Sequence, residues 1–350
     1  MSETTAQELL NLGIDRYHAG ALEDSVQWLE AAIAKFQEEG NIEGELLARS
    51  NLCEAYTRAG YYVKAIESAT ILLAKSRQAN MQEYQVRAIG RLGMALQQID
   101  LRGRWKELRP LLIEGVEMAR NLGLTYWEVQ NLETLGSSAV RMGEHEQGLI
   151  WLQDALAALR PDIYEEAFFR TRIYQALSDL ARSRGDWAEA VRYAEIAVDT
   201  AQTNRNNSPH LVAAAKLTLA QAERLRGERA TSLELVHEVL PQARREKWRV
   251  QEQSAEYLRS ELERELGHPD VAEEAARRAL ELAREMRMKE EEVMCLLSWG
   301  QALLLLGRKD EARDTIQQAR WLSQERDYED HFYVSEELLA GIAPLRSSRC

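Results

Sequence analysis

Small and aliphatic side chains recur along the chain at fixed distances from a column of glycines. Five, nine and twelve residues after each glycine the chain carries mostly Ala, Leu, Val or Ser, as at Ala190, Ala194 and Ala197. Because these offsets differ by four and three, the residues lie on one stripe of a helix that another helix can approach closely. The glycines are spaced 40 to 43 residues apart and are Gly20, Gly60, Gly103, Gly143, Gly185, Gly227, Gly267 and Gly307.

A second pattern lies upstream of each glycine and predicts another helix. An apolar residue, usually Leu, stands eight residues before the glycine and a small residue follows it, as in Leu135-Gly136 and Leu52-Cys53. The glycine itself suits the turn between the helices, because it tolerates the left-handed backbone that ends a helix. The pattern therefore predicts eight helix pairs, followed by a terminal helix over residues 330–342.

These residues resemble the tetratricopeptide repeat (TPR). Leu135-Gly136 with Gly143, Gly148, Leu152 and Ala155 follows the family pattern, and so does the run GDWAEA at 185–190. The units are longer than the usual repeat of about 34 residues and are similar to the long variant of kinesin light chains and bacterial peptide-receptor regulators. The resemblance covers about residues 5–322. It implies an all-α fold, a right-handed α-solenoid (superhelix) of about eight TPR-like helix pairs plus a C-terminal capping helix.

The expected organisation is one repeat array over residues 1–329, a capping helix over 330–342 and a flexible tail over 343–350. The least helical stretch is 203–210, where we expect an exposed, protease-sensitive loop. Ser208 is predicted to cap the following helix and Pro209 to occupy its first position.

Several aromatic and sulfur side chains fall into the repeat pattern. Tyr62, Trp105 and Trp187 each stand two residues after a column glycine, which predicts core packing at the turn. Cys53 and Cys295 lie among small or apolar residues and are predicted to pack rather than to react. Trp127 and Trp248, early in first helices, are less well explained by this pattern.

Composition and charge limit the classes of partner and compartment. The chain has 44 Lys+Arg against 57 Asp+Glu and a formal net charge of −13, which disfavours a general nucleic-acid binder. Its three cysteines are too few and too scattered for a disulfide framework or a zinc site. The N-terminal segment lacks the pattern of a secretory signal, and the longest aliphatic run is far too short for a membrane span. We expect a cytoplasmic protein.

The chain carries none of the motifs that mark a catalytic or cofactor site. It has no phosphate-binding glycine loop, and His145-Glu146 is not followed by the second histidine of a zinc protease. Its six histidines lie at predicted turns or helix surfaces. The sequence therefore predicts a non-enzymatic protein with no cofactor and no metal, and an enzyme without a recognisable motif is the least favoured alternative.

The resemblance implies that first helices line the concave side, with partner-facing positions 13, 10, 6 and 3 residues before each glycine. Gln offers donors and acceptors to an extended backbone, and Arg binds carboxylates bidentately. A run of Arg182, Arg224 and Arg264 would select an acidic segment. The candidate partner-binding residues are Gln130, Glu133, Arg172, Gln175, Asp179, Arg182, Gln221, Arg224, Tyr257, Glu261 and Arg264.

Two considerations weigh against a specific assignment. The helix dipole alone favours arginine in the last turn of a helix, and an empty groove also needs a polar lining. The carboxylate clamp of chaperone-binding family members is incomplete, because Arg87 and Arg91 occupy basic places without the asparagine partners.

The leading hypothesis is a protein–protein interaction scaffold or adaptor that holds a partner peptide or helix in the concave groove. The alternative is a regulatory sensor whose superhelix changes pitch on binding a peptide or small ligand. Since the first repeat begins by about residue 5, the sensor hypothesis needs a separate output protein. Self-association is a further hypothesis, because terminal repeats expose apolar faces unless they are capped.

Overall fold

The computed structural model describes residues 4–99, 101–161, 163, 165–203 and 208–342. Within these residues the chain forms seventeen α-helices and no strand. The first helices of the pairs are α1 (Ala6–His18), α3 (Ile42–Arg58), α5 (Gln82–Ile99), α7 (Thr125–Arg141), α9 (Glu166–Ser183), α11 (Pro209–Arg226), α13 (Arg249–Glu265) and α15 (Lys289–Leu305). The second helices are α2 (Leu22–Glu38), α4 (Tyr62–Gln78), α6 (Leu101–Leu122), α8 (His145–Ala158), α10 (Trp187–Gln202), α12 (Arg229–Arg245), α14 (Pro269–Met286) and α16 (Lys309–Arg326). The odd helix α17 (Glu329–Ile342) follows the eighth pair.

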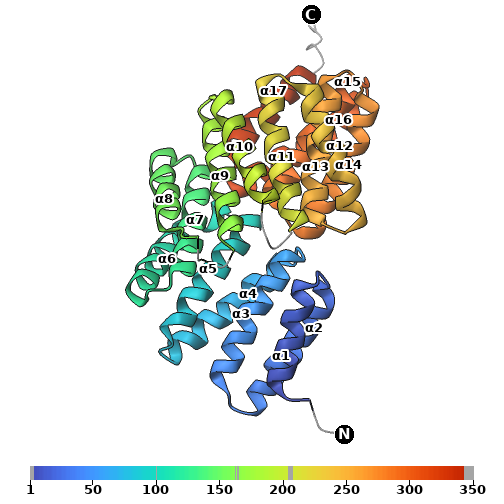
Figure 1. Ribbon diagram of the computed structural model, residues 1–350. Helices are drawn as coiled ribbons and strands as arrows, with labels where there is room; N and C mark the ends of the chain where they lie inside the picture. Colours follow the sequence, from blue (N-terminus) through green and yellow to red (C-terminus); the bar gives the residue numbers. More distant parts are fainter. Residues whose placement is uncertain (1–3, 100, 162, 164, 204–207, 343–350) are drawn as a thin grey trace, which may run out of the picture. The chain divides into compact units, whose positions relative to one another are not determined.

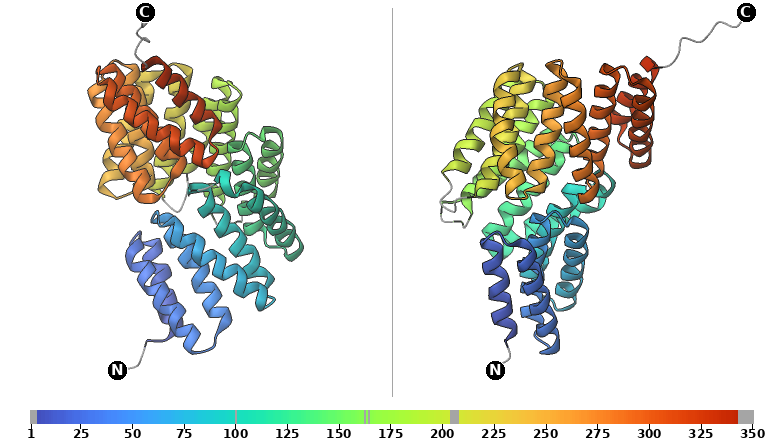
Figure 2. Two further views of the ribbon diagram at one scale, coloured as in Figure 1. Left: turned by 180° about the vertical axis from the view of Figure 1, so that it is seen from behind. Right: turned by 90° about the vertical axis from the view of Figure 1, so that its right-hand side faces the viewer.

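The chain divides into two compact units, Met1–Ala176 and Leu177–Cys350, here called the N-terminal and C-terminal units. In each unit, helices that follow one another in the sequence pack side by side (Figures 1 and 2). First helices also contact the next first helix, as α5 contacts α7 in one unit and α11 contacts α13 in the other. This nearest-neighbour packing confirms the predicted all-α solenoid of helix pairs with a capping helix.

Most of the predicted turn glycines end a first helix in the left-handed conformation. Seven of the eight have φ between 75° and 104°. The prediction for Gly103 is wrong, because this glycine lies in the first turn of α6. About three extra residues precede it in the third repeat, so α5 ends at Ile99 and α6 has already begun, at Leu101, before the glycine.

A second series of turns joins each pair to the next and was not predicted. Two of them use Gly40 and Gly123, but others place Asn80, Lys247, Arg287 and Asp327 in the left-handed region at φ of 54–60°. These residues stand about twenty positions after the first series of turns. Since several residue types occupy the same conformation, the sequence shows no column there.

Small residues let the two helices of a pair approach closely. A Cβ atom on Gly136 would lie 2.8 Å from Leu152 Cγ, and one on Gly300 would lie 2.4 Å from Ile316 Cγ1. Buried serines in the same columns bond the partner helix, as Ser25 Oγ donates to the carbonyl of Gly13 at 2.8 Å. The small-residue stripes are therefore the contact surfaces of the pairs.

The predicted packing residues are mostly buried. Tyr62 and Trp105 are buried, with Trp105 Nε1 donating to Glu144 Oε1 at 2.8 Å, and so are Cys53 and Cys295. Trp187 is an exception at 38% exposure, because its ring lies over the turn at Gly185 rather than in the core.

The predicted loop and tail lie partly or wholly outside the described residues. Pro209 is the first residue of α11, as predicted, and Ser208 takes the N-cap position without a capping hydrogen bond from its side chain. Residues 204–207 of the loop and the tail 343–350, with Cys350, fall outside the description. Among the helices that are described, none is long and apolar enough to cross a membrane.

Candidate functional site

Polar and aromatic side chains of consecutive first helices meet on one face of the N-terminal unit. Tyr17 on α1 donates its hydroxyl to Glu54 Oε1 on α3 at 2.8 Å, and Arg91 on α5 pairs with the other oxygen of that carboxylate. Tyr126 on α7 donates to Glu165 Oε2, just before α9, at 3.1 Å. These five residues are called the N-terminal cluster.

Arginines lie against aromatic rings in and beside this cluster. The guanidinium carbons of Arg91 and Arg87 are 5.0 and 5.6 Å from the ring centre of Trp127. Arg58 lies 5.0 Å from the centre of Tyr17. A cation over an aromatic face gains about 0.5–2 kcal/mol, so these contacts keep the arginine side chains in place on the first-helix face. They also give Trp127, unexplained by the repeat pattern, a function in the structure.

Burial and the charges of neighbouring side chains shift the pKa values of residues in the cluster. Burial, and then the negative charge of Glu54, raise the pKa of Tyr17 and of Tyr126 above the ordinary value, so both hydroxyls remain protonated donors. Burial also raises the pKa of Glu165, and Glu54 adds to that effect. The Glu165 carboxylate is therefore less well compensated than Glu54, which accepts from both Tyr17 and Arg91.

A second polar cluster lies on the first helices of the C-terminal unit. Arg224 on α11 pairs with Glu265 on α13 and approaches Glu261 Oε2 at 3.5 Å. Arg264 reaches the same oxygen of Glu261 at 3.1 Å. Ser298 on α15 donates to Glu261 Oε1 at 2.8 Å. We call Arg224, Glu261, Arg264, Glu265 and Ser298 the C-terminal cluster.

The three arginines predicted to select an acidic segment are all engaged with carboxylates of their own chain. Arg182 pairs with Asp179 at 2.5 Å, and Arg224 and Arg264 belong to the C-terminal cluster. An acidic partner would have to compete with these internal carboxylates. The charge of each of these arginines is therefore largely balanced within the chain.

Two other predicted contact residues hold helices together and do not line an open surface. Gln130 and Glu133 on α7 are each 1% exposed. Glu133 pairs with Arg172 on α9 at 3.0 Å. Gln175, Gln221 and Tyr257 are half-buried, and burial raises the pKa of Tyr257.

The polar column six residues before each glycine links successive repeats. Glu54 pairs with Arg91 of the next first helix, and Glu261 accepts from Ser298 in the same way. Gln97 Nε2 donates to Ser137 Oγ and to Ser138 Oγ at 2.8 Å each. The hydrogen bonds between repeats explain why this column is polar, an explanation that the sequence did not suggest.

Sequence reasoning missed Tyr17, Tyr126 and Glu165 as members of a site. Tyr126 and Glu165 lie 17 and 20 residues before their glycines, outside the four positions implied by the family resemblance. The sequence showed the basic character of Arg87 and Arg91, but the ring that both contact, Trp127, is distant from them in the sequence.

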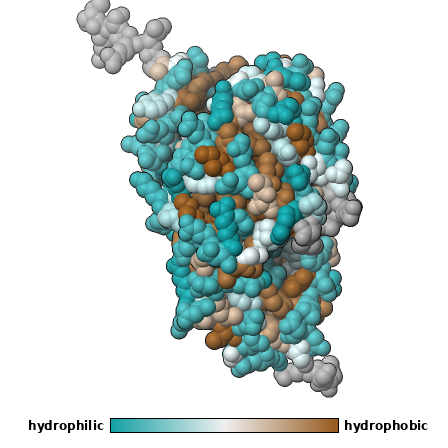
Figure 3. All heavy atoms as spheres, turned by 60° about the vertical axis from the view of Figure 1, so that its left-hand side comes forward, coloured by the Kyte–Doolittle hydropathy of each residue, from teal (hydrophilic) through white to brown (hydrophobic). Residues whose placement is uncertain are grey.

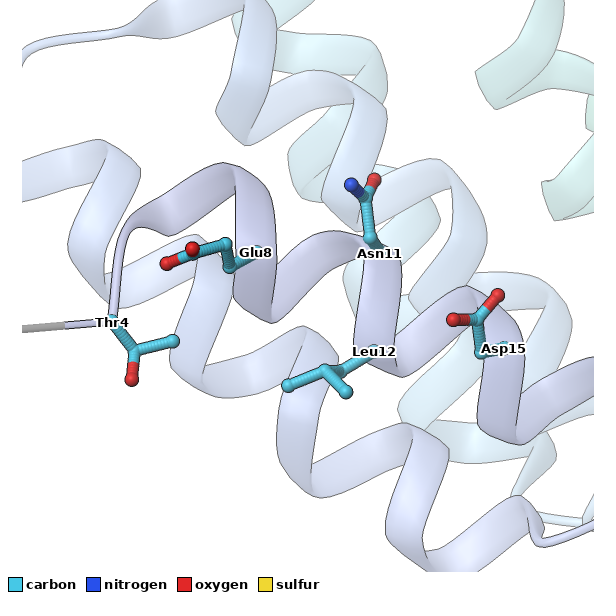
Figure 4. A pocket seen from close by; sticks show the side chains of 5 residues that line it. All are labelled: Thr4, Glu8, Asn11, Leu12 and Asp15. Atoms are coloured by element: carbon cyan, nitrogen blue, oxygen red, sulfur yellow. The ribbon is translucent and has the colours of Figure 1, made fainter.

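Two open, shallow hollows lie on the surface. One runs along α1 and is lined by Thr4, Glu8, Asn11, Leu12 and Asp15 (Figure 4). Another is lined by residues of α12, α13 and α14 and mixes arginines with glutamates. Hydrophobic residues on the face shown in Figure 3 form patches interrupted by hydrophilic ones. Within the described residues, no group of three or more His, Cys, Asp or Glu could hold a metal ion.

Solved structures with the same fold are found, although no family model and no curated protein matches the sequence. A Rap conjugation gene regulator of plasmid pLS20, in complex with the Phr* peptide, is 15% identical with a TM-score of 0.63, covering 82% of this chain and 76% of that one. A Rap protein complexed with Competence and Sporulation Factor is 13% identical with a TM-score of 0.58, covering 96% and 97%. The Pyrococcus horikoshii signal-transduction ATPase PH0952, which carries a tetratricopeptide repeat sensor, is 12% identical with a TM-score of 0.60 over 93% of this chain. The chain spans half the length of that ATPase.

Proposed function

Because the chain is a TPR-like repeat protein, we propose that it is a non-catalytic interaction module that binds a peptide or helix of a protein partner. The binding surface is the first-helix face of the N-terminal unit. The observation that carries the proposal is the N-terminal cluster. Its two hydrogen-bonded groups, one on α1, α3 and α5 and one on α7 and the residue before α9, are connected because Arg91 and Tyr126 both contact the ring of Trp127.

The chemistry of this face suits a protein partner. Tyr, Trp and Arg dominate the energetics of protein interfaces, because they bury large areas and donate directional hydrogen bonds. Arg87 sits at the edge of the cluster, stacked on Tyr84 and Trp127 and paired with Glu83. Its side chain keeps 23% exposure, so a partner can reach a guanidinium that is already held in place. Preorganisation of this kind lowers the entropic cost of binding.

A finer form of the proposal is that the bound segment is acidic. In the C-terminal unit such a segment would have to displace Asp179, Glu261 or Glu265 from the predicted arginines. The N-terminal unit offers a second place, because Arg87 lies against the ring of Trp127 and its carboxylate partner, Glu83, is an exposed residue of the same helix. One of the similar solved structures was obtained with the Phr* peptide, and this supports a peptide ligand by analogy of fold.

Affinity capture with a matched pair of variants tests the proposal. Arg87→Glu reverses the charge on the first-helix face, and we expect it to reduce recovery of the specific partner at least tenfold, because charge reversal at an interface adds repulsion to the lost bond. The bait is the full chain in a lysate of the source organism, and recovery is quantified by mass spectrometry.

Arg192→Glu is the matched control. Arg192 also pairs with a glutamate of its own helix, Glu189, and also lies over a tyrosine, Tyr193, but it belongs to the second helix α10. The Arg192→Glu bait should recover as much of the partner as the unaltered chain does. Equal recovery by the Arg87→Glu bait, with unchanged helicity by circular dichroism, would place the binding surface elsewhere.

The alternative function is a regulatory sensor. It is favoured by the similar structures of a conjugation gene regulator and of an ATPase with a repeat sensor. Small-angle scattering of the chain with and without the captured partner distinguishes the sensor from the adaptor. A changed small-angle scattering profile on binding supports the sensor, and an unchanged profile supports the adaptor.

A further inference from the structure

The last described helix, α17, follows the pattern of a first helix, and no second helix of its own pair packs against it among the described residues. Six residues after the turn that precedes a first helix, the side chain is buried at Leu46, Val86, Val129, Gln253 and Val293, each at most 3% exposed. The equivalent residue of α17 is Tyr333, six positions after Asp327, and it is 68% exposed.

A second position gives the same result. Thirteen residues after the turn, the earlier first helices carry a small buried residue: Cys53, Gly93, Gly136, Ser260 and Gly300. Gly136 lies against Leu152 of α8 and Gly300 against Ile316 of α16, so the second helix of the same pair covers this position. In α17 the equivalent residue, Ala340, is exposed, and the space beside Gly341 is open.

Tyr333, Glu337, Ala340 and Gly341 therefore share one helix face that no described residue covers, because they are four, three and one residues apart. We call them the α17 face. The helix lies at the end of the C-terminal unit, beyond α16 (Figure 2). Its small residues would let another helix approach as closely as α16 approaches α15.

The negative charge of α17 indicates which kind of helix can bind to the α17 face. The helix carries Glu329, Asp330, Glu336 and Glu337 and no Lys or Arg. Glu336 pairs with Arg320 of α16, whereas Glu337, in the centre of the α17 face, has no ion pair among the described residues. We infer that the α17 face docks an amphipathic helix of another protein that has a small–aliphatic stripe flanked by Lys or Arg.

A second copy of this chain is a poorer occupant. Two antiparallel α17 helices would place Tyr333 of one against Gly341 of the other, and this would bring their Glu337 side chains together at the centre. Like charges that face each other in a packed contact are destabilising. A basic helix removes this repulsion and fills the same space.

A peptide with the sequence of α4, Tyr62–Gln78, has the inferred chemistry. Its stripe is Ala65, Ala69 and Leu72, and it carries three cations against one carboxylate. The acidic control peptide has the sequence of α14, Pro269–Met286, whose stripe is Ala272, Ala276 and Ala279, with five carboxylates against three cations. Each dye-labelled peptide is titrated with the full chain, and binding is followed by fluorescence anisotropy.

We expect the α4 peptide to bind saturably and at least tenfold more tightly than the α14 peptide. Ala340→Glu should weaken its binding at least tenfold, because a long charged side chain blocks the close approach. Glu337→Lys should reverse the preference of the two peptides. Ala34→Glu, a change at an exposed position of α2, should leave binding within twofold of the unaltered chain.

Two results would overturn the inference. One is equal binding of the α4 peptide to the unaltered chain and to Ala340→Glu, or no saturable binding at all. The other is a dimer in analytical ultracentrifugation that Ala340→Glu converts to a monomer, since the occupant would then be a second copy. The α17 face shares no residue with the N-terminal cluster, so neither result depends on the proposed function.

Discussion

At the scale of single residues, buried carboxylates are held charged by cations of neighbouring helices. Glu45 on α3 accepts from Lys75 Nζ at 2.7 Å, from Arg49 Nε at 2.8 Å and from Gln37 at 2.7 Å. Burial acts to raise the pKa of Glu45, but these hydrogen bonds outweigh it and the pKa is lowered from the ordinary 4.5. Glu292 occupies the equivalent place in α15 and is held by Lys289 and Arg284, with a lowered pKa for the same reasons.

Acid should therefore remove part of the stability. A carboxyl group whose pKa is lower in the folded state contributes stability that is complete above its unfolded pKa and is lost as the pH falls through the folded value. We expect Glu45→Gln to lower the free energy of unfolding by about 1–3 kcal/mol at pH 7. The variant should also lose less stability than the unaltered chain as the pH falls from about 5.5 to about 3, through the unfolded and then the folded pKa of Glu45.

Urea denaturation at pH 7 and over this acid range measures both effects. Glu107→Gln is the control, because Glu107 is exposed and pairs only with the exposed Arg104. An identical pH dependence for Glu45→Gln and the unaltered chain would contradict the prediction.

At the scale of elements, replacing a helix glycine by alanine should raise or lower the stability, depending on whether another helix packs against that glycine. Alanine is favoured over glycine within a helix by about 1 kcal/mol. On Gly300 the added Cβ would lie 2.4 Å from Ile316 Cγ1, whereas on Gly341 it would meet nothing within 4 Å. Close packing at Gly300 should therefore outweigh the preference of the helix for alanine. At Gly341, where nothing is close, that preference should hold.

We expect Gly300→Ala to destabilise the protein by about 1–3 kcal/mol, because overpacking forces α15 and α16 apart. Gly341→Ala should stabilise it by up to about 1 kcal/mol. Thermal unfolding followed by circular dichroism measures both changes, and the same sign for the two would contradict this account of the stripe.

The elements also show where sequence reasoning stopped. The turns that end first helices were found because glycine occupies seven of them in the left-handed conformation. The turns between pairs were missed, because Asn80, Lys247, Arg287 and Asp327 adopt that conformation without a common side chain. Gly103 was misplaced because a local insertion shifts the turn while the periodic count continues through it.

At the scale of the whole molecule, each unit contains, among its described residues, one buried cysteine whose reactivity can report the unfolding of that unit. Cys53 lies in the N-terminal unit and Cys295 in the C-terminal unit. Burial raises the pKa of Cys53 to about 11 and raises that of Cys295 as well. Since the thiolate is the reactive form, neither thiol should react in the native protein at neutral pH.

In a Cys350→Ser background, we expect the two thiols to become reactive over different ranges of urea. Each helix pair in such an array is stabilised by its contacts with the adjacent pairs. Because the chain divides into two compact units, we expect the two units to unfold separately. Pulsed alkylation followed by peptide mass spectrometry assigns a midpoint to each cysteine. A single shared midpoint would show that the array opens as one cooperative unit.

By itself, the sequence determined the period, the helix pairs, the small-residue contacts within them and the absence of a recognisable catalytic motif. These features are local or repeat at a fixed distance, so the spacing of residue types records them. The tertiary structure decided which polar groups are satisfied within the chain. Arg224 meets Glu261 and Glu265, and Arg91 meets Glu54 and Trp127, because packing sets the angle between successive helix pairs. That angle does not follow from the period, so only the folded chain distinguishes an arginine that binds its own helices from one that a partner can reach.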